Sequence, residues 1–128
     1  MSIFKKFLLE QNMNTIKKEI VYKAQQIYDD WNQEDGIDDI YGSGGICDEI
    51  ARSIGNIMVD NGYNVKDGWD DEHAFMIAYN KSRAYIVDIP PEVYETGYGY
   101  KWKKKKNVKF KPSDVYIEEI PIEDIEEE

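Results

Sequence analysis

Hydrophobic residues recur every three or four positions in two stretches of the chain, and this spacing predicts two amphipathic helices. The first is predicted for residues 15–31, with Asn14 as its N-cap. Its apolar stripe consists of Ile16, Ile20, Ala24, Ile27 and Trp31. The second begins near Cys47 and ends at Gly62, which can take the left-handed conformation that closes a helix. Its expected buried face consists of Ile50, Ala51, Ile54, Ile57 and Met58.

After the second helix the chain becomes rich in branched and aromatic residues, which favour strands. Residues 73–80 and 83–89 are divided by a short polar link and predict a β-hairpin. The two prolines at 90–91 end the second strand, because proline cannot donate to a β-ladder. Two further short strands are predicted at 107–110 and 115–120. Helices followed by antiparallel strands are typical of an α+β fold.

Length and composition favour one domain. A chain of 128 residues that is 41% hydrophobic can bury one core, so we expect a single domain over 1–128. Within it, residues 1–13 are interpreted as an N-terminal extension, 14–120 as the core and 121–128 as an acidic tail. The longest apolar run in the extension is too short for a signal peptide or a membrane span. We therefore expect a cytoplasmic protein with no membrane partner, and the sequence leaves the oligomeric state open.

The formal net charge of −10 argues against direct nucleic-acid binding, which normally needs a basic surface. The charge is uneven, because residues 101–111 carry seven lysines and residues 118–128 are mostly acidic. The lysine run is interpreted as a solvated loop or an edge strand, and the alternative is a surface for an acidic partner. The acidic run is interpreted as a solubilising end, and the alternative is a mimic of a nucleic-acid backbone.

The one cysteine of the chain, Cys47, opens the second predicted helix directly after a glycine-rich loop. Backbone N–H groups at a helix start favour a thiolate, and Gly44 and Gly45 would let a substrate approach the backbone. The N–H of Cys47 is then a natural donor to a developing oxyanion. Asp48 and Glu49 oppose this, since their negative charges flank the thiol.

The hairpin brings the one histidine, His73, to the same sheet face as Asp88. A tight turn at Asn80-Lys81 would place the two residues directly opposite each other. A turn at Lys81-Ser82 would place Asp88 opposite Phe75 and diagonal to His73. A three-residue loop would separate them. Either two-residue turn therefore lets a carboxylate orient an imidazole, as in a nucleophilic site.

The segments 44-GGICDEIA-51, 72-EHAF-75 and 86-IVDIP-90 occur in an order that resembles the papain-like superfamily, particularly its small transglutaminase-like members. The resemblance covers roughly residues 44 to 90. It implies a papain-like core, in which a helix bearing the cysteine packs with the other N-terminal helix on a small antiparallel sheet. Residues 88–102 also resemble a stretch of small uncharacterised proteins of bacteria and their mobile elements, which implies no activity.

The papain-like resemblance implies three roles: Cys47 as nucleophile, His73 as general base and then acid, and Asp88 as the residue that fixes the imidazole tautomer. Papain-like peptidases usually carry a glutamine shortly before the cysteine for the oxyanion hole, and this sequence has none there. Ser43 or a backbone amide would have to take that role. An aromatic residue usually follows the cysteine, and Asp48 and Glu49 stand there instead.

These features predict a thiol-dependent hydrolase or acyltransferase acting on amide bonds of a protein or peptide, without a cofactor. Peptidase, glutamine deamidase and transglutaminase-like activities all stay open. Trp69, Tyr98 and Trp102 are candidates to line the substrate cleft. The alternative is a non-catalytic acidic binding protein, such as a phage-type inhibitor or a nucleic-acid mimic, in which Cys47 is an ordinary core residue.

A metal site is a second chemical interpretation of the acidic residues at 67–72, together with His73 and Asp88. Consecutive strand residues point to opposite faces, however, and no metal-binding spacing is present. The glycine-rich 42–46 also lacks the lysine and hydroxyl of a phosphate-binding loop. We therefore expect no metal.

Overall fold

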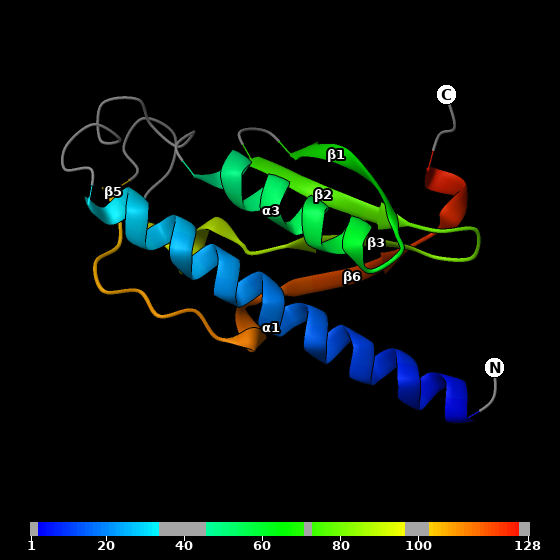
Figure 1. Cartoon of the computed structure of the whole chain (residues 1–128). Helices are drawn as coiled ribbons and strands as arrows, with labels where there is room; N and C mark the ends of the chain where they lie inside the picture. Colours follow the sequence, from blue (N-terminus) through cyan, green and yellow to red (C-terminus); the bar gives the residue numbers. More distant parts are fainter. Residues whose placement is uncertain (1–2, 34–45, 71–72, 97–102, 126–128) are drawn as a thin grey trace.

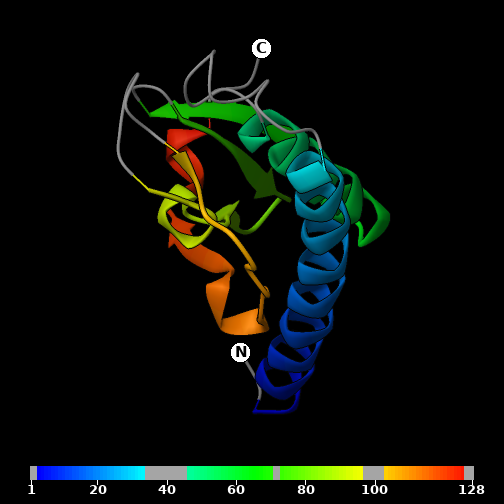
Figure 2. The same cartoon turned by 90° about the vertical axis from the view of Figure 1, so that its left-hand side faces the viewer.

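The computed structural model describes residues 3–33, 46–70, 73–96 and 103–125. Two helices, α1 (Ile3–Gln33) and α3 (Cys47–Asp60), pack on one face of a four-stranded antiparallel sheet (Figure 1). The view turned by 90° shows both helices on the same side of the sheet (Figure 2). The predicted α+β fold class is confirmed.

Helix α1 is longer than predicted. Asn14 lies in its interior and is not an N-cap, and the expected N-terminal extension is helical from Ile3 onward. The reason is that no glycine or proline occurs between residues 3 and 33, and lysine, leucine and glutamate, which favour helices, are frequent at its start. The predicted stripe faces the core, with Tyr28 added and Ile27 only partly buried.

Helix α3 matches its prediction. It begins at Cys47, and the chain leaves it through Gly62, whose φ of 94° is the left-handed conformation expected there. Its buried face contains all of the predicted apolar residues, and Gly55 joins them. α3 lies against both α1 and the second strand of the sheet, so it forms the centre of the core.

The sheet has the strand order β1-β2-β3-β6. Its strands are β1 (Asn64–Asp70), β2 (His73–Tyr79), β3 (Ala84–Asp88) and β6 (Tyr116–Ile120). The predicted hairpin is β2 and β3, and its turn is at Lys81-Ser82, the second of the two turns considered. The backbone N–H of Asn80 donates to the carbonyl of Arg83 at 2.9 Å. β6 confirms the last predicted strand and pairs with β3.

The strand predicted at 107–110 is wrong. This segment has no ladder partner in the described structure, and α1 satisfies its peptide groups instead. The Phe110 N–H donates to Gln25 Oε1 at 2.8 Å, and Gln25 Nε2 donates to the Val108 carbonyl at 3.1 Å. Asn107 has a φ of 60°, which bends the chain out of an extended path. Phe110 thereby enters the core without a strand.

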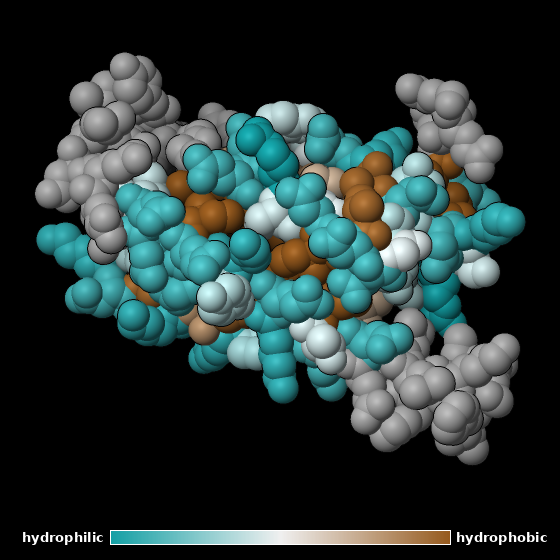
Figure 3. Space-filling view, in the orientation of Figure 1, coloured by the Kyte–Doolittle hydropathy of each residue, from teal (hydrophilic) through white to brown (hydrophobic). Residues whose placement is uncertain are grey.

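Small elements complete the fold beside the main sheet. A two-stranded sheet pairs β4 (Glu95–Thr96) with β5 (Lys103–Lys104), so part of the lysine run is a short strand. The 3-10 turns are η1 (Pro91–Val93), η3 (Pro112–Asp114) and η4 (Ile122–Asp124). On the helix side the surface is mostly hydrophilic, with small hydrophobic areas (Figure 3). The described lysines at 106, 109 and 111 are exposed, as a solvated segment should be.

Candidate functional site

Three element ends meet at one edge of the fold. Cys47 is the first residue of α3, His73 the first of β2 and Asp88 the last of β3. Because β2 and β3 are antiparallel, the start of one lies beside the end of the other, and α3 begins above the same edge (Figure 1). The topology thus brings together three residues that are far apart in sequence.

His73 and Asp88 form a close pair. The register pairs Met76 with Val87, so Asp88 is diagonal to His73 on the same face of the sheet. His73 Nε2 lies 2.7 Å from Asp88 Oδ2. Among the described residues, Asp88 is the one charged side chain that is buried. The expected orientation of the imidazole by this carboxylate is therefore present.

The Cys47 thiol completes the cluster by hydrogen-bonding with the His73 ring. Burial by itself lowers the pKa of His73, but the hydrogen bonds and negative charges of Asp88 and Cys47 outweigh it and raise the pKa to about 10. At neutral pH the imidazolium is thus the favoured form, between a carboxylate and a sulfur atom.

Asp88 is subject to opposing effects. Burial raises the pKa of its carboxyl, and the hydrogen bond and positive charge of His73 work against that shift. The imidazolium therefore compensates part of the cost of burying this carboxylate.

A groove of about 400 Å³ gives access to the pair from the sheet face that the helices leave uncovered. His73 and Asp88 line it together with Trp69, Tyr116 and Glu118. Trp69 is 67% exposed, so it lies where a cleft-lining residue was expected. Cys47, in contrast, is only 6% exposed. The groove therefore reaches the imidazole and the carboxylate, while the thiol is enclosed.

The negative residues that follow the cysteine do not enter the site. Asp48 and Glu49 belong to the first turn of α3 and both are exposed. Carboxylates in the first turn also interact favourably with the helix dipole. Solvent therefore screens the negative charges of Asp48 and Glu49, which were expected to disfavour a negatively charged sulfur at the start of the helix.

Five of the predicted site residues, the oxyanion candidates and two cleft aromatics, lie outside the described residues: Ser43, Gly44, Gly45, Tyr98 and Trp102.

Sequence reasoning missed two residues near the site, Tyr94 and Glu95. Both follow the prolines at 90–91 that end β3. Glu95 is half-buried near His73: burial raises its pKa to about 7, although the charge of His73 works in the opposite direction. Tyr94 is fully buried. Their position six and seven residues after Asp88 was the available signal, since a chain reversed at the prolines returns to the same edge.

The shifted pKa of Glu95 predicts a pH-dependent effect of Glu95→Gln on stability. A folded pKa of about 7, above the ordinary 4.5, means that ionisation of this carboxyl destabilises the fold progressively between those two values. We expect the variant to match the wild type in urea unfolding at pH 4 and to be more stable at pH 8. Glu92→Gln is the matched control, because Glu92 is exposed. An equal stability difference at both pH values would contradict the assignment.

Among the described residues, no group of three or more histidine, cysteine, aspartate and glutamate side chains is arranged to hold a metal ion. In the same part of the chain, no helix combines the length and the apolar character needed to cross a membrane. Comparisons with protein-family models, with curated proteins and with solved structures find no match. The chemistry of the site therefore rests on its geometry alone.

Proposed function

We propose that this protein is a thiol-dependent hydrolase or acyltransferase that acts on amide bonds. The observation that carries the proposal is the position of one imidazole between two partners, the Asp88 carboxylate at 2.7 Å and the Cys47 thiol. The order of Cys47, His73 and Asp88 along the chain resembles that of papain-like and transglutaminase-like enzymes. A papain-like core is part of this proposal.

The three residues can divide the reaction as follows. The Cys47 thiolate attacks the carbonyl carbon, a C–S bond forms, and the carbonyl π electrons move to oxygen. As the C–N bond breaks, His73 gives its proton to the leaving nitrogen, which leaves a thioester and a neutral imidazole. Water or an amine then attacks the thioester, His73 takes its proton and becomes an imidazolium again, and the C–S bond breaks to release the Cys47 thiolate. Asp88 holds the ring and stabilises its positive charge.

The groove supports a protein or peptide substrate. Trp69 and Tyr116 are both exposed large aromatic residues, and both line the groove with His73. Two aromatic side chains beside a catalytic pair provide apolar contact area for an extended chain. Glu118, also in the lining, adds a negative charge. Whether water or an amine accepts the acyl group depends on what enters this groove.

The burial of Cys47 favours a second candidate function. At 6% exposure the thiol resembles an ordinary core cysteine. In that case the protein would be a non-catalytic acidic binding protein, and its net charge of −10 would direct it to a basic partner. The His73–Asp88 pair would then only stabilise the sheet edge.

The two candidates differ in their reaction with p-nitrophenyl acetate. A catalytic site is expected to release one equivalent of p-nitrophenolate in a burst, about 100-fold or more faster than free cysteine at the same pH. Because Cys47 is the one cysteine in the sequence, the acetyl group found by mass spectrometry must disappear in Cys47→Ala. Acetylation no faster than that of free cysteine would reject the enzyme and favour the binding protein.

A further inference from the structure

Strand β1 forms one edge of the four-stranded sheet, and within the described chain no strand pairs with its outer side. Peptide groups alternate in direction along an antiparallel strand, so every second residue of β1 points outward. The bond between Asn80 and Arg83 shows that even-numbered residues of β2 bond to β3 and odd-numbered ones to β1. In the register, these odd-numbered residues lie opposite the even-numbered residues of β1. The outward peptide groups are therefore those of Val65, Asp67 and Trp69.

The side chains of the same three residues line a groove of about 390 Å³ between β1 and α3. Figure 1 shows β1 at the sheet edge, with α3 in front of β2. Two exposed apolar side chains border the groove, Val59 at 52% and Trp69 at 67% exposure. Small buried residues also line it and leave the space open: Ala51, Gly55 and Ala74. An open strand edge beside a groove is the arrangement in which proteins bind an extended peptide as an added strand.

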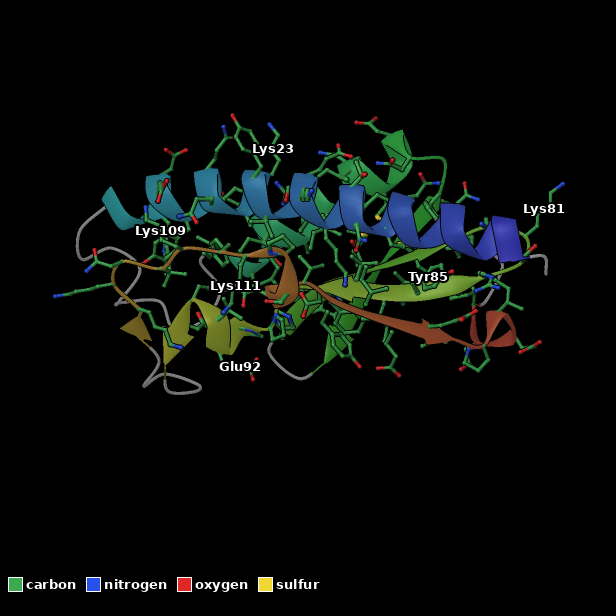
Figure 4. The ribbon with its side chains drawn as sticks, turned by 90° about the horizontal axis from the view of Figure 1, so that it is seen from below. Lys23, Lys81, Tyr85, Glu92, Lys109 and Lys111 are labelled. Atoms are coloured by element: carbon green, nitrogen blue, oxygen red, sulfur yellow. The ribbon has the colours of Figure 1, made fainter. Side chains whose placement is uncertain are left out.

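The opposite edge of the sheet is less suited to this role. Figure 4 shows β6 beginning at the turn that follows Lys111. Glu118 and Glu119 of this strand are exposed, and Pro121 follows it directly. Charged residues and proline at an edge hinder pairing with a further strand. β1, in contrast, is seven residues long and contains no proline.

The charges in the lining indicate what the added strand carries. Asp48 and Asp67 supply two exposed carboxylates, and Arg52 supplies one guanidinium. None of the three forms an ion pair within the part of the chain that the structure describes. Arg52 lies one turn after Asp48 on α3, where the two charges attract each other. Asp67 is then the carboxylate that a lysine or arginine of the added strand would complement.

A second copy of this chain fits the edge less well. Antiparallel pairing about the middle of β1 would place two Asp67 carboxylates opposite each other on the same face. Like charges directly opposite each other destabilise a pair of strands. Each copy would also bring a net charge of −10 to the interface.

We propose that β1 and the groove beside α3 bind an extended segment of another protein as an added strand, antiparallel to β1. The side chains of this segment follow the pattern apolar, any, basic, any, apolar. Its basic residue lies opposite Asp67, and its apolar residues lie opposite Val65 and Trp69. The inference goes beyond the proposed function and needs no reaction of the thiol. Trp69 also lines the groove that contains His73 and Asp88, so the two grooves are adjacent.

The probe is a fluorescein-labelled peptide, Thr-Val-Thr-Lys-Thr-Val-Thr, whose binding is measured by fluorescence anisotropy at low salt. We expect saturable binding, and binding about tenfold weaker or more when glutamate replaces the peptide's lysine. N-methylation of the lysine amide removes its ladder bond to Asp67 and should weaken binding about 5- to 20-fold. N-methylation of a neighbouring threonine, whose N–H points away from β1, is the control and should change little. Equal effects of the two methyl groups would contradict strand addition.

Charge reversal tests the role of Asp67. Asp67→Lys should weaken binding of the lysine peptide about tenfold or more, and it should bind the glutamate peptide more tightly than the wild type does. Because Asp67 is exposed, the urea midpoint should stay close to that of the wild type. Asp60→Lys is the matched control, since Asp60 is an exposed residue of α3 outside the groove lining. Equal losses in both variants, or unchanged binding in Asp67→Lys, would overturn the proposal.

Sedimentation velocity tests the competing occupant. We expect the wild type to be a monomer at the concentrations at which it binds the peptide. A wild-type dimer that Asp67→Asn strengthens would show that a second copy of this chain covers β1, and the proposal would be wrong.

Discussion

Replacement of His73 with alanine is expected to slow alkylation of Cys47 by iodoacetamide about 100-fold at pH 6, because an ordinary thiol is less than about 1% ionised there. In the wild type the imidazolium beside the sulfur persists up to about pH 10, so a positive charge lies next to the thiol throughout the neutral range. The advantage of the wild type over the variant should therefore be largest at the acidic end of the range between pH 6 and pH 9. The rate of the variant should rise steeply with pH and approach that of the wild type near pH 9.5.

Access to the thiol has to be separated from its ionisation, because Cys47 is only 6% exposed. Alkylation in urea, where both proteins are unfolded, should proceed at equal rates and provides the reference. His73→Ala also leaves the Asp88 carboxylate buried without its partner, so the folded fraction must be measured at each pH. Equal rates for the two folded proteins at pH 6 would show that His73 does not activate the thiol.

The proximity of His73 and Asp88 could be predicted because it depends only on the alternation of side chains between the two faces of a sheet. Both two-residue turns place the two residues on the same face, so the prediction did not need the register. The register itself was open, since Asn80-Lys81 and Lys81-Ser82 are both acceptable turns. In the structure Asn80 Oδ1 accepts from the N–H groups of Ser82 and Arg83 at 2.8 Å, and this local contact favours the second turn.

Strand β1 was missed because its sequence contains Gly68 and four polar residues, which are unfavourable in strands. Its pairing with β2 explains why it forms. Gly68 lies opposite Phe75, and a Cβ atom at position 68 would be 2.3 Å from the Phe75 ring. The aromatic ring therefore covers the glycine backbone, as in other cross-strand glycine–aromatic pairs. This contact is between strands, and residue preferences along one segment do not reveal it.

The error at 107–110 and the omission of Tyr94 have the same cause. Both concern segments whose partners are distant in sequence: Gln25 of α1 satisfies the peptide groups of Val108 and Phe110, and Trp31 packs against Tyr94. Periodicity detects which face of a helix or strand is buried, but it does not detect irregular segments that bond to a side chain. The chemistry near the site thus depends partly on contacts that only the fold supplies.

Substitution of Asp88 with asparagine is expected to lower the pKa of His73 by about one to three units. In the wild type the pKa is about 10, because the attraction of Asp88 and Cys47 outweighs the effect of burial. Asparagine has nearly the same size as aspartate but carries no charge. Less attraction would then oppose burial, which lowers the pKa of His73. Since His73 is the one histidine in the sequence, its ring signals in proton NMR give one titration without ambiguity. Glu118→Gln, which removes an exposed carboxylate from the groove lining, is the control and should leave the midpoint near its wild-type value.

The raised pKa of His73 also makes the free energy of unfolding depend on pH. Asp88→Asn should reveal the direction of this dependence. A folded pKa of about 10 against an ordinary 6.5 means that protonated His73 stabilises the fold fully below about pH 6.5, and that this contribution is lost as the pH rises through 10. In urea unfolding, the advantage of the wild type over Asp88→Asn should thus be large at pH 6 and shrink toward pH 10. A wild-type titration midpoint near 6.5 would mean that the carboxylate and the thiol do not hold the proton on the ring, and the nucleophilic role of Cys47 would lose its physical basis.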